Sequence, residues 1–204
     1  GLPEDSPDAV PTIVYAPNAE KANVSYIDDT TGKTLSAKDL TGNYGSTDPY
    51  RTGDTIADYE KQGYQLVSDN YPTNGVVYNQ DGTVQSFEVH LTHGTTPVGP
   101  NNPQTPGEPI NPDDPDSPKW PAGTDKDSLT TDVHQTIHYQ YGDGSQAAPD
   151  KTDSTTFDHQ VEIDKVTGEI VKDDGWTAEN GKTSFDAKTS PVIAGYTASE
   201  ASSK

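Results

Sequence analysis

The sequence predicts an α+β, β-rich protein of two small modules in series, joined by an extended proline-rich linker. Short runs of alternating apolar and polar residues occur on both sides of the middle of the chain, and this spacing is typical of half-buried strands. Only one stretch, in the first half, favours a helix. Between the two sets of runs, nine prolines occupy every third position from Pro97 to Pro121.

Residues 1–18 form an N-terminal arm with a single strand-type burst, Ile13-Val14-Tyr15, between Pro11 and Pro17. One short strand is not stable by itself, so it must dock on another sheet or stay loose. Our hypothesis is that this burst is the last strand of a preceding repeat.

The first module is assigned to residues 19–95. Its turn at residues 29–33 carries Gly32, which favours a hairpin, and Gly63 is placed to end a short helix. The predicted elements are a strand at 24–28, a return strand from 34, a helix before Gly63, and strands at 64–67 and 84–91. This order predicts a small sheet covered by one helix.

The linker is assigned to residues 96–127. Polyproline II has three residues per turn, so prolines at this spacing lie along one side of an extended helix, about 75 Å long over its full length. A disordered tether is the alternative. Ile110, Trp120 and the acidic end of the linker also suggest a segment that docks on the second module, which would shorten the free length.

The second module is assigned to residues 128–204. Alternating runs predict strands at 133–141 and 155–163. Ile170-Val171 and Trp176 form a third apolar group, and Trp176 is expected in the core. A Gly-Tyr pair occurs in each module, at Gly63-Tyr64 and Gly195-Tyr196. In the first module a closing strand follows this pair, whereas none follows in the second, so we expect the second module to lack its final strand.

Charge and composition exclude several classes of function. Thirteen basic and thirty-three acidic residues give a net charge of −20, which argues against nucleic acid or an anionic membrane surface as a partner. Cysteine is absent, so no disulfide or thiol catalyst is available. The absence of both Cys and Met suits an exposed extracellular protein. No apolar run is long enough for membrane insertion.

The sequence contains no recognisable catalytic motif, and we expect no enzymatic activity. The five histidines are interpreted as solvated strand residues; His134 and His138, four residues apart on one strand, are too distant to share a metal. Asp113, Asp114 and Asp116 are candidate oxygen ligands for a structural Ca²⁺, although Pro112 and Pro115 interrupt them and a solvated acidic loop is the alternative.

Trp120, near the end of the linker, has two interpretations. It anchors the linker to the second module, or it is a platform that binds a ligand. Beyond these residues the sequence offers no candidate ligand-binding position.

Several stretches resemble one Mub repeat of the mucus-binding surface adhesins of lactobacilli. In the first module these are ANVSYIDDTTGKTL at 22–35, YEKQGYQLVSD at 59–69 and QSFEVHL at 85–91, which look like a mucin-binding (MucBP) module. In the second they are QTIHYQYGDG at 135–144, VTGE at 166–169, Trp176 and PVIAGY at 191–196, which look like its partner domain. The resemblance covers nearly the full chain.

The resemblance implies two ubiquitin-like β-grasp domains in tandem, displayed in a repeat array anchored to the cell wall of a Gram-positive bacterium. It implies binding of mucin glycoproteins through their glycans, and also of immunoglobulins without antigen recognition. Separately from the resemblance, we expect multivalent binding in the array, no required cofactor and an isolated repeat that is monomeric. The resemblance assigns no ligand-binding residue. Two alternatives stay open: an immunoglobulin-binding β-grasp module that uses an exposed sheet edge, and a structural stalk that projects a distal adhesin.

Overall fold

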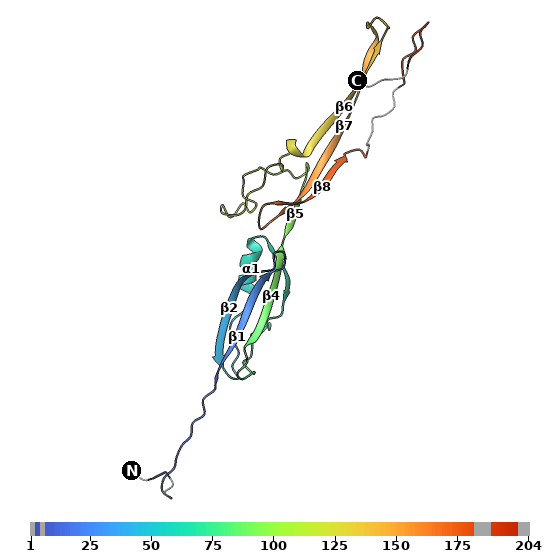
Figure 1. Ribbon diagram of the computed structural model, residues 1–204. Helices are drawn as coiled ribbons and strands as arrows, with labels where there is room; N and C mark the ends of the chain where they lie inside the picture. The colour runs from blue at the N-terminus through green and yellow to red at the C-terminus, as the bar shows by residue number, and fades with distance from the viewer. Residues whose placement is uncertain (1–2, 5–6, 182–188, 200–204) are drawn as a thin grey trace. The chain divides into compact units, whose positions relative to one another are not determined.

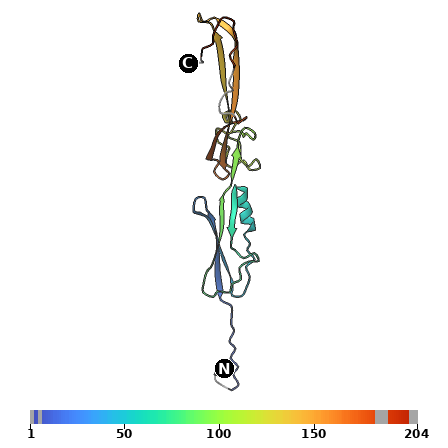
Figure 2. The same cartoon turned by 90° about the vertical axis from the view of Figure 1, so that its right-hand side faces the viewer.

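The computed structural model describes residues 3–4, 7–181 and 189–199, and the chain divides into two units after Gly94 (Figure 1). The first unit contains β1 (Ala19–Asp28), β2 (Lys33–Asn43), α1 (Gly53–Lys61), β3 (Tyr64–Asp69) and β4 (Gln85–His93). The sheet order is β2-β1-β4-β3, with β1 and β4 parallel and the other pairs antiparallel. The α1 helix lies beside this sheet (Figure 2). The predicted small sheet with one helix is therefore confirmed.

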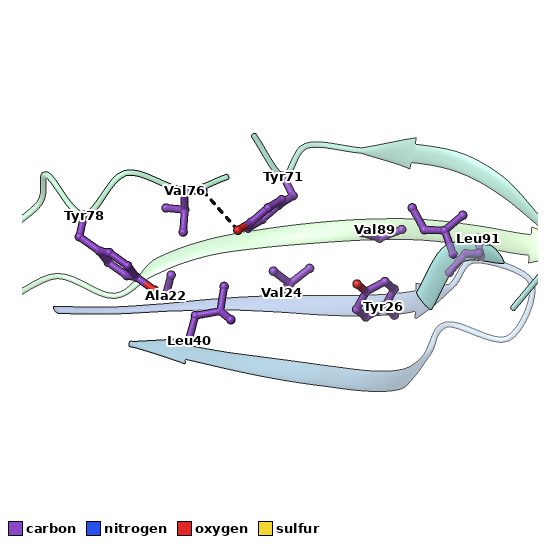
Figure 3. Packing of buried hydrophobic residues seen from close by; sticks show 10 residues of the cluster. Ala22, Val24, Tyr26, Leu40, Tyr71, Val76, Tyr78, Val89 and Leu91 are labelled. Atoms are coloured by element: carbon purple, nitrogen blue, oxygen red, sulfur yellow. Dashed lines mark hydrogen bonds between the residues drawn. The ribbon is translucent and has the colours of Figure 1, made fainter. Parts of the chain in front are cut away.

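The core of the first unit forms on one face of β1. Its alternate residues Ala22, Val24 and Tyr26 are buried, and Val89 and Leu91 of β4 lie beside them (Figure 3). Only Ile56 of α1 is buried. The loop between β3 and β4 completes the core with three further buried residues, Tyr71, Val76 and Tyr78.

The hydroxyl groups of the buried tyrosines are satisfied within the unit. Tyr78 donates a hydrogen bond to Asp48 Oδ2 at 2.5 Å, and burial together with this carboxylate raises the pKa of Tyr78. The Tyr71 hydroxyl donates to the Tyr50 carbonyl at 2.9 Å and accepts from the Val76 amide at 3.2 Å. The loop is therefore held by specific bonds as well as by apolar contact.

The second unit is organised around one long strand. It contains β5 (Thr95–Val98), the 3₁₀ turn η1 (Asp127–Leu129), β6 (Thr130–Gln140), β7 (Gln146–Asp164) and β8 (Ile170–Ala178). All its strand pairs are antiparallel. Residues 157–158 of β7 pair with both β6 and β8, and residues 161–163 pair with both β5 and β8. It follows that β5 and β6 share one edge of β7, and β8 occupies the other.

The prediction of a second β-grasp domain is not confirmed. The described residues of this unit contain no α-helix and no parallel strand pair. The expected missing final strand concerns the end of the chain, where residues 200–204 lie outside the described residues.

The prediction that residues 96–127 form an extended linker is wrong. Pro97 belongs to β5, and residues 99–126, here named the proline loop, double back on themselves (Figure 1). Four backbone hydrogen bonds of 2.8–2.9 Å join its two arms: Gln104 N to Thr124 O, Gly107 N to Trp120 O, Trp120 N to Glu108 O, and Ile110 N to Pro118 O. Because proline has no N–H, the residues between the prolines supply these donors.

The proline loop is packed onto the sheet. Ile110 and Trp120 contact the buried cluster of the second unit, which consists of Val98, Leu129, Val161 and Ile163. At the turn between β7 and β8, a Cβ added to Gly168 would lie 2.7 Å from the Lys119 carbonyl oxygen. This close approach confirms the hypothesis that the linker docks on the second module.

The prediction that Trp176 belongs to the core is wrong. Trp176 is 47% exposed, and Ile170 and Val171 are exposed as well. All three lie on β8, which pairs only with β7 among the described strands. An edge strand of this kind has one neighbour and leaves much of its surface in water.

Gly42 tests the packing of the first unit. A Cβ at this position would lie 2.3 Å from Cε2 of Tyr78, whose ring is 1% exposed and held by Asp48. We predict that Gly42→Ala lowers the free energy of unfolding by about 1–3 kcal/mol in urea denaturation, because the ring cannot move aside without losing its bond. Gly53→Ala is the control, since an added Cβ there meets open space. Equal stability of the two variants would contradict this account.

The folded proline loop is tested by a distance. The chain has no cysteine, so Thr105→Cys and Ala122→Cys, both at exposed positions, can be spin-labelled uniquely. A polyproline II helix would separate them by about 53 Å. We predict a separation under about 25 Å in pulsed electron paramagnetic resonance, because neighbouring backbone groups are hydrogen-bonded across the loop. A distance distribution centred at about 53 Å would contradict the folded loop and support an extended polyproline II linker.

Candidate functional site

The proline loop forms an open hollow with a volume of about 360 Å³. Its lining combines one aromatic ring, three further apolar residues and three polar side chains: Trp120, Pro109, Ile110, Pro112, Gln104, Thr105 and Glu108. This volume lies within the range of small-ligand sites, and so does the mixture of an apolar floor with a few polar groups.

Backbone hydrogen bonds fix the two sides of the hollow. The bonds between Trp120 and residues 107 and 108 hold the backbone of Glu108 beside that of Trp120. Ile110 and Trp120 rest on the buried cluster of the second unit, so the floor is supported by the sheet. Gln104 is held through its backbone N–H to Thr124, and its side-chain amide donates to the Asn102 carbonyl at 3.1 Å. The lining is thus preorganised although it belongs to a loop.

The hollow carries negative charge only. Glu108 is the one ionisable residue among the seven that line it. Lys119 lies on the same loop but is not in the lining, and its ammonium group donates to the Pro115 carbonyl. A hydroxyl-rich neutral ligand fits this arrangement better than an anion, because a carboxylate accepts hydrogen bonds from hydroxyls and repels other carboxylates.

Trp120 has the anchoring role predicted for it. The indole packs against the second core and also lines the hollow, so the two interpretations are compatible in space. Binding of a ligand there stays a prediction. The sequence did not point to Gln104, Thr105 or Glu108, because only the doubling of the loop brings them to Trp120.

The candidate calcium ligands lie at the tip of the proline loop. The Asp114 carboxylate accepts the Asp116 N–H at 2.9 Å, and its backbone carbonyl accepts the Ser117 N–H at 3.0 Å. The Asp113 N–H donates to Asn111 Oδ1 at 3.1 Å. Among the described residues no group of three Asp, Glu or His side chains is arranged to hold a metal ion. The calcium site stays a prediction.

A second aromatic surface lies on the sheet itself. Trp176 stacks on His159, its partner across β7 and β8, with ring centroids 4.7 Å apart and an interplanar angle of 19°. His159 Nε2 lies 2.5 Å from Asp173 Oδ1. The bonds that Asp173 accepts from His159 and from the Gly175 N–H lower its pKa. The sequence alone did not predict this stack, because it depends on the pairing register of β7 and β8. That register places Trp176 on His159, exposed to solvent and outside the core.

Two histidines of the first unit are paired rather than simply solvated. His90 lies 2.6 Å from Asp29 and 2.7 Å from Glu88, and these hydrogen bonds raise the pKa of His90 above 6.5. His93 Nε2 lies 2.6 Å from the buried Asp28 carboxylate. Burial works to raise the pKa of Asp28, but the bonds from His93 and from Thr30 and Thr31 lower it overall. These pairs join β4 to the end of β1, which is a structural role.

No helix in the described part of the chain is long and apolar enough to cross a membrane. Residues 20–93 match the family described as a mucin binding domain, and residues 124–203 match the Muc B2-like domain family. A search of curated proteins gave no match.

Two solved structures are similar to the chain over most of their length. The crystal structure of Mub-RV is 34% identical, covers 87% of this chain and is itself 84% covered, with a TM-score of 0.60. The type 2 repeat of the mucus binding protein MUB from Lactobacillus reuteri is 33% identical, with 87% and 85% coverage and a TM-score of 0.47. By its identity to Mub-RV over most of both chains, this chain belongs to the Mub repeat family.

Proposed function

We propose that this chain is a non-enzymatic adhesion repeat of a bacterial surface protein, and that it binds mucus glycoproteins through their glycans. The names of the matching families and of the type 2 repeat of MUB support this function. We place the repeat outside the cell, in an array anchored to the wall of a Gram-positive bacterium. In the first unit, the sheet order β2-β1-β4-β3 with its parallel central pair supports a ubiquitin-like β-grasp domain.

The hollow at Trp120 is the observation that carries the binding proposal. A sugar ring has an apolar face of C–H groups, which can lie on the indole, and a rim of hydroxyls. Those hydroxyls can donate to the Glu108 carboxylate and exchange hydrogen bonds with Gln104 and Thr105, which all line the same hollow. The hollow therefore supplies both kinds of contact that a sugar residue requires.

Charge selects the class of sugar. The chain carries −20 overall, and the lining contains a carboxylate and no cation. Sialylated or sulfated glycans would be repelled at this site, whereas neutral sugars would not. At 0.1 M salt, repulsion between exposed charges is largely screened beyond about 10 Å, so binding to a sialylated mucin should strengthen as salt is raised.

One hollow of this size gives weak binding, and multivalency supplies the rest. A polymeric glycan that contacts one repeat raises the effective concentration of its other sugars near the next repeat. Overall adhesion in an array can then exceed the affinity of a single repeat by orders of magnitude without any new contact.

A specific observation favours binding to a protein as the second candidate. β3 lies at one edge of the first sheet, and its Leu66 and Val67 are exposed. An exposed, apolar edge strand can pair with a strand of another protein, as an immunoglobulin-binding module would require. Binding to an immunoglobulin that persists after its complete deglycosylation would support this alternative.

Mutation of the hollow tests the glycan site. We predict that Glu108→Gln weakens retention of the single chain on immobilised, desialylated mucin by about three- to tenfold in surface plasmon resonance, since one charge-assisted hydrogen bond is lost. Trp120→Phe should weaken it as well. Glu108 is exposed, so its replacement leaves the fold intact.

Trp176→Ala is the matched control, because it removes the other tryptophan of the same unit. It should bind like the unmodified chain. Loss of binding in this variant alone would move the site to the stack on His159 and overturn the assignment to the hollow. Absence of any retention of the unmodified chain on mucin would favour the structural stalk.

A further inference from the structure

The outer edge of β6 has no partner strand among the described residues. In the first unit, the opening strand β1 pairs with β2 on one side and with the parallel β4 on the other. In the second unit, β6 and β7 also form an antiparallel hairpin, but β6 pairs with β7 alone. Residues 131–136 of β6, six in a row, are all exposed to solvent. Backbone N–H and C=O groups on this edge are available to an added strand.

The N-terminal arm contains a strand-type segment that has no sheet to join in its own unit. Residues 10–17 are extended and make no backbone hydrogen bond within the described part of the chain. Val10, Ile13, Val14 and Tyr15 are between 78% and 92% exposed. Both views show this segment running away from β1 (Figures 1 and 2). So much exposed apolar surface on one short segment indicates an interaction site.

We propose that residues 12–16 of one copy of this chain add to the outer edge of β6 in a second copy, as a strand parallel to β6. The parallel direction is proposed by analogy with the first unit, in which β4 lies parallel to β1, the first strand of the β1–β2 hairpin. Pro11 and Pro17 have no N–H, so they limit the added strand to the residues between them. This inference does not depend on mucin binding.

Composition supports this occupant. Residues 9–18 carry no Asp, Glu, Lys, Arg or His, in a chain with a net charge of −20. The arm can therefore approach another copy without adding charge repulsion at the contact. On β6, Val133 is partly exposed, and it lies opposite the buried Thr155 of β7. A strand added beside it would bury part of Val133 and part of the arm.

The geometry of this contact is head to tail. The arm belongs to the first unit of one copy and the edge to the second unit of another, so the interface is heterologous and can propagate along an array. Five residues supply few hydrogen bonds, so separate copies should associate only at high concentration. Linking two copies in tandem raises the effective concentration to about the millimolar range and makes the contact favourable.

A tandem fusion of two full copies tests the proposal. Val14→Pro in the arm of the second copy removes an N–H from the middle of the added strand and should lower the first melting transition by about 5 °C in calorimetry. The same substitution in the arm of the first copy is the control. It changes the composition identically, but that arm has no preceding second unit to join. Equal melting curves for the two variants would overturn the proposal.

A distance provides the second readout. Spin labels at Thr12→Cys of the second copy and Gln135→Cys of the first copy should lie within about 20 Å, because neighbouring strands are about 5 Å apart. Val14→Pro in the second arm should broaden this distribution. A distance that is long, or unchanged by the substitution, would show that the arm does not pair with β6.

Discussion

Each unit lacks enough apolar residues on its strands to bury a sheet face, and the structure depends on loops that supply the missing surface. Hydrophobic residues are 28% of the chain. In the first unit the loop before β4 contributes Tyr71, Val76 and Tyr78 to the core. In the second unit the proline loop packs Ile110 and Trp120 against the buried cluster that includes Val161 and Ile163 of β7. The folded loop therefore has a structural role in the second unit. The candidate site depends on the packing of Ile110 and Trp120 against the buried cluster.

Alternation along the strands was enough to predict most of the first unit. The residues that alternate in β1 and β4 are the ones that the structure buries, and Gly63 follows the helix as expected. The proline loop was mispredicted for a physical reason. A period of three fixes the local φ of each proline, but it says nothing of the donors between them. Gln104, Gly107, Ile110 and Trp120 close the loop through contacts that no local pattern contains.

The two tryptophans show how much of the candidate site could be predicted from the sequence. Trp120 was recognised because it interrupts a polar, proline-rich stretch, and the structure gives it a packed position beside a hollow. Trp176 was expected in the core, and the sequence grouped it with the apolar pair Ile170-Val171. Its exposure depends on β8 having one neighbour, which is a property of the sheet and not of the segment. The polar lining of the hollow could not be predicted for a similar reason: Gln104, Thr105 and Glu108 lie on one arm of the loop, and only the folding of the loop brings them to Trp120 on the other arm.

Amide hydrogen exchange of the proline loop in the intact chain tests the central claim most directly. If the loop is a folded part of the second unit, the amides of Gly107, Ile110 and Trp120, which donate to carbonyls across the loop, are protected to an extent comparable with those of β7. Exchange of these three amides at the rate of an unstructured peptide, while β7 stays protected, would contradict the account. The loop would then be a tether, and the hollow would not exist in solution.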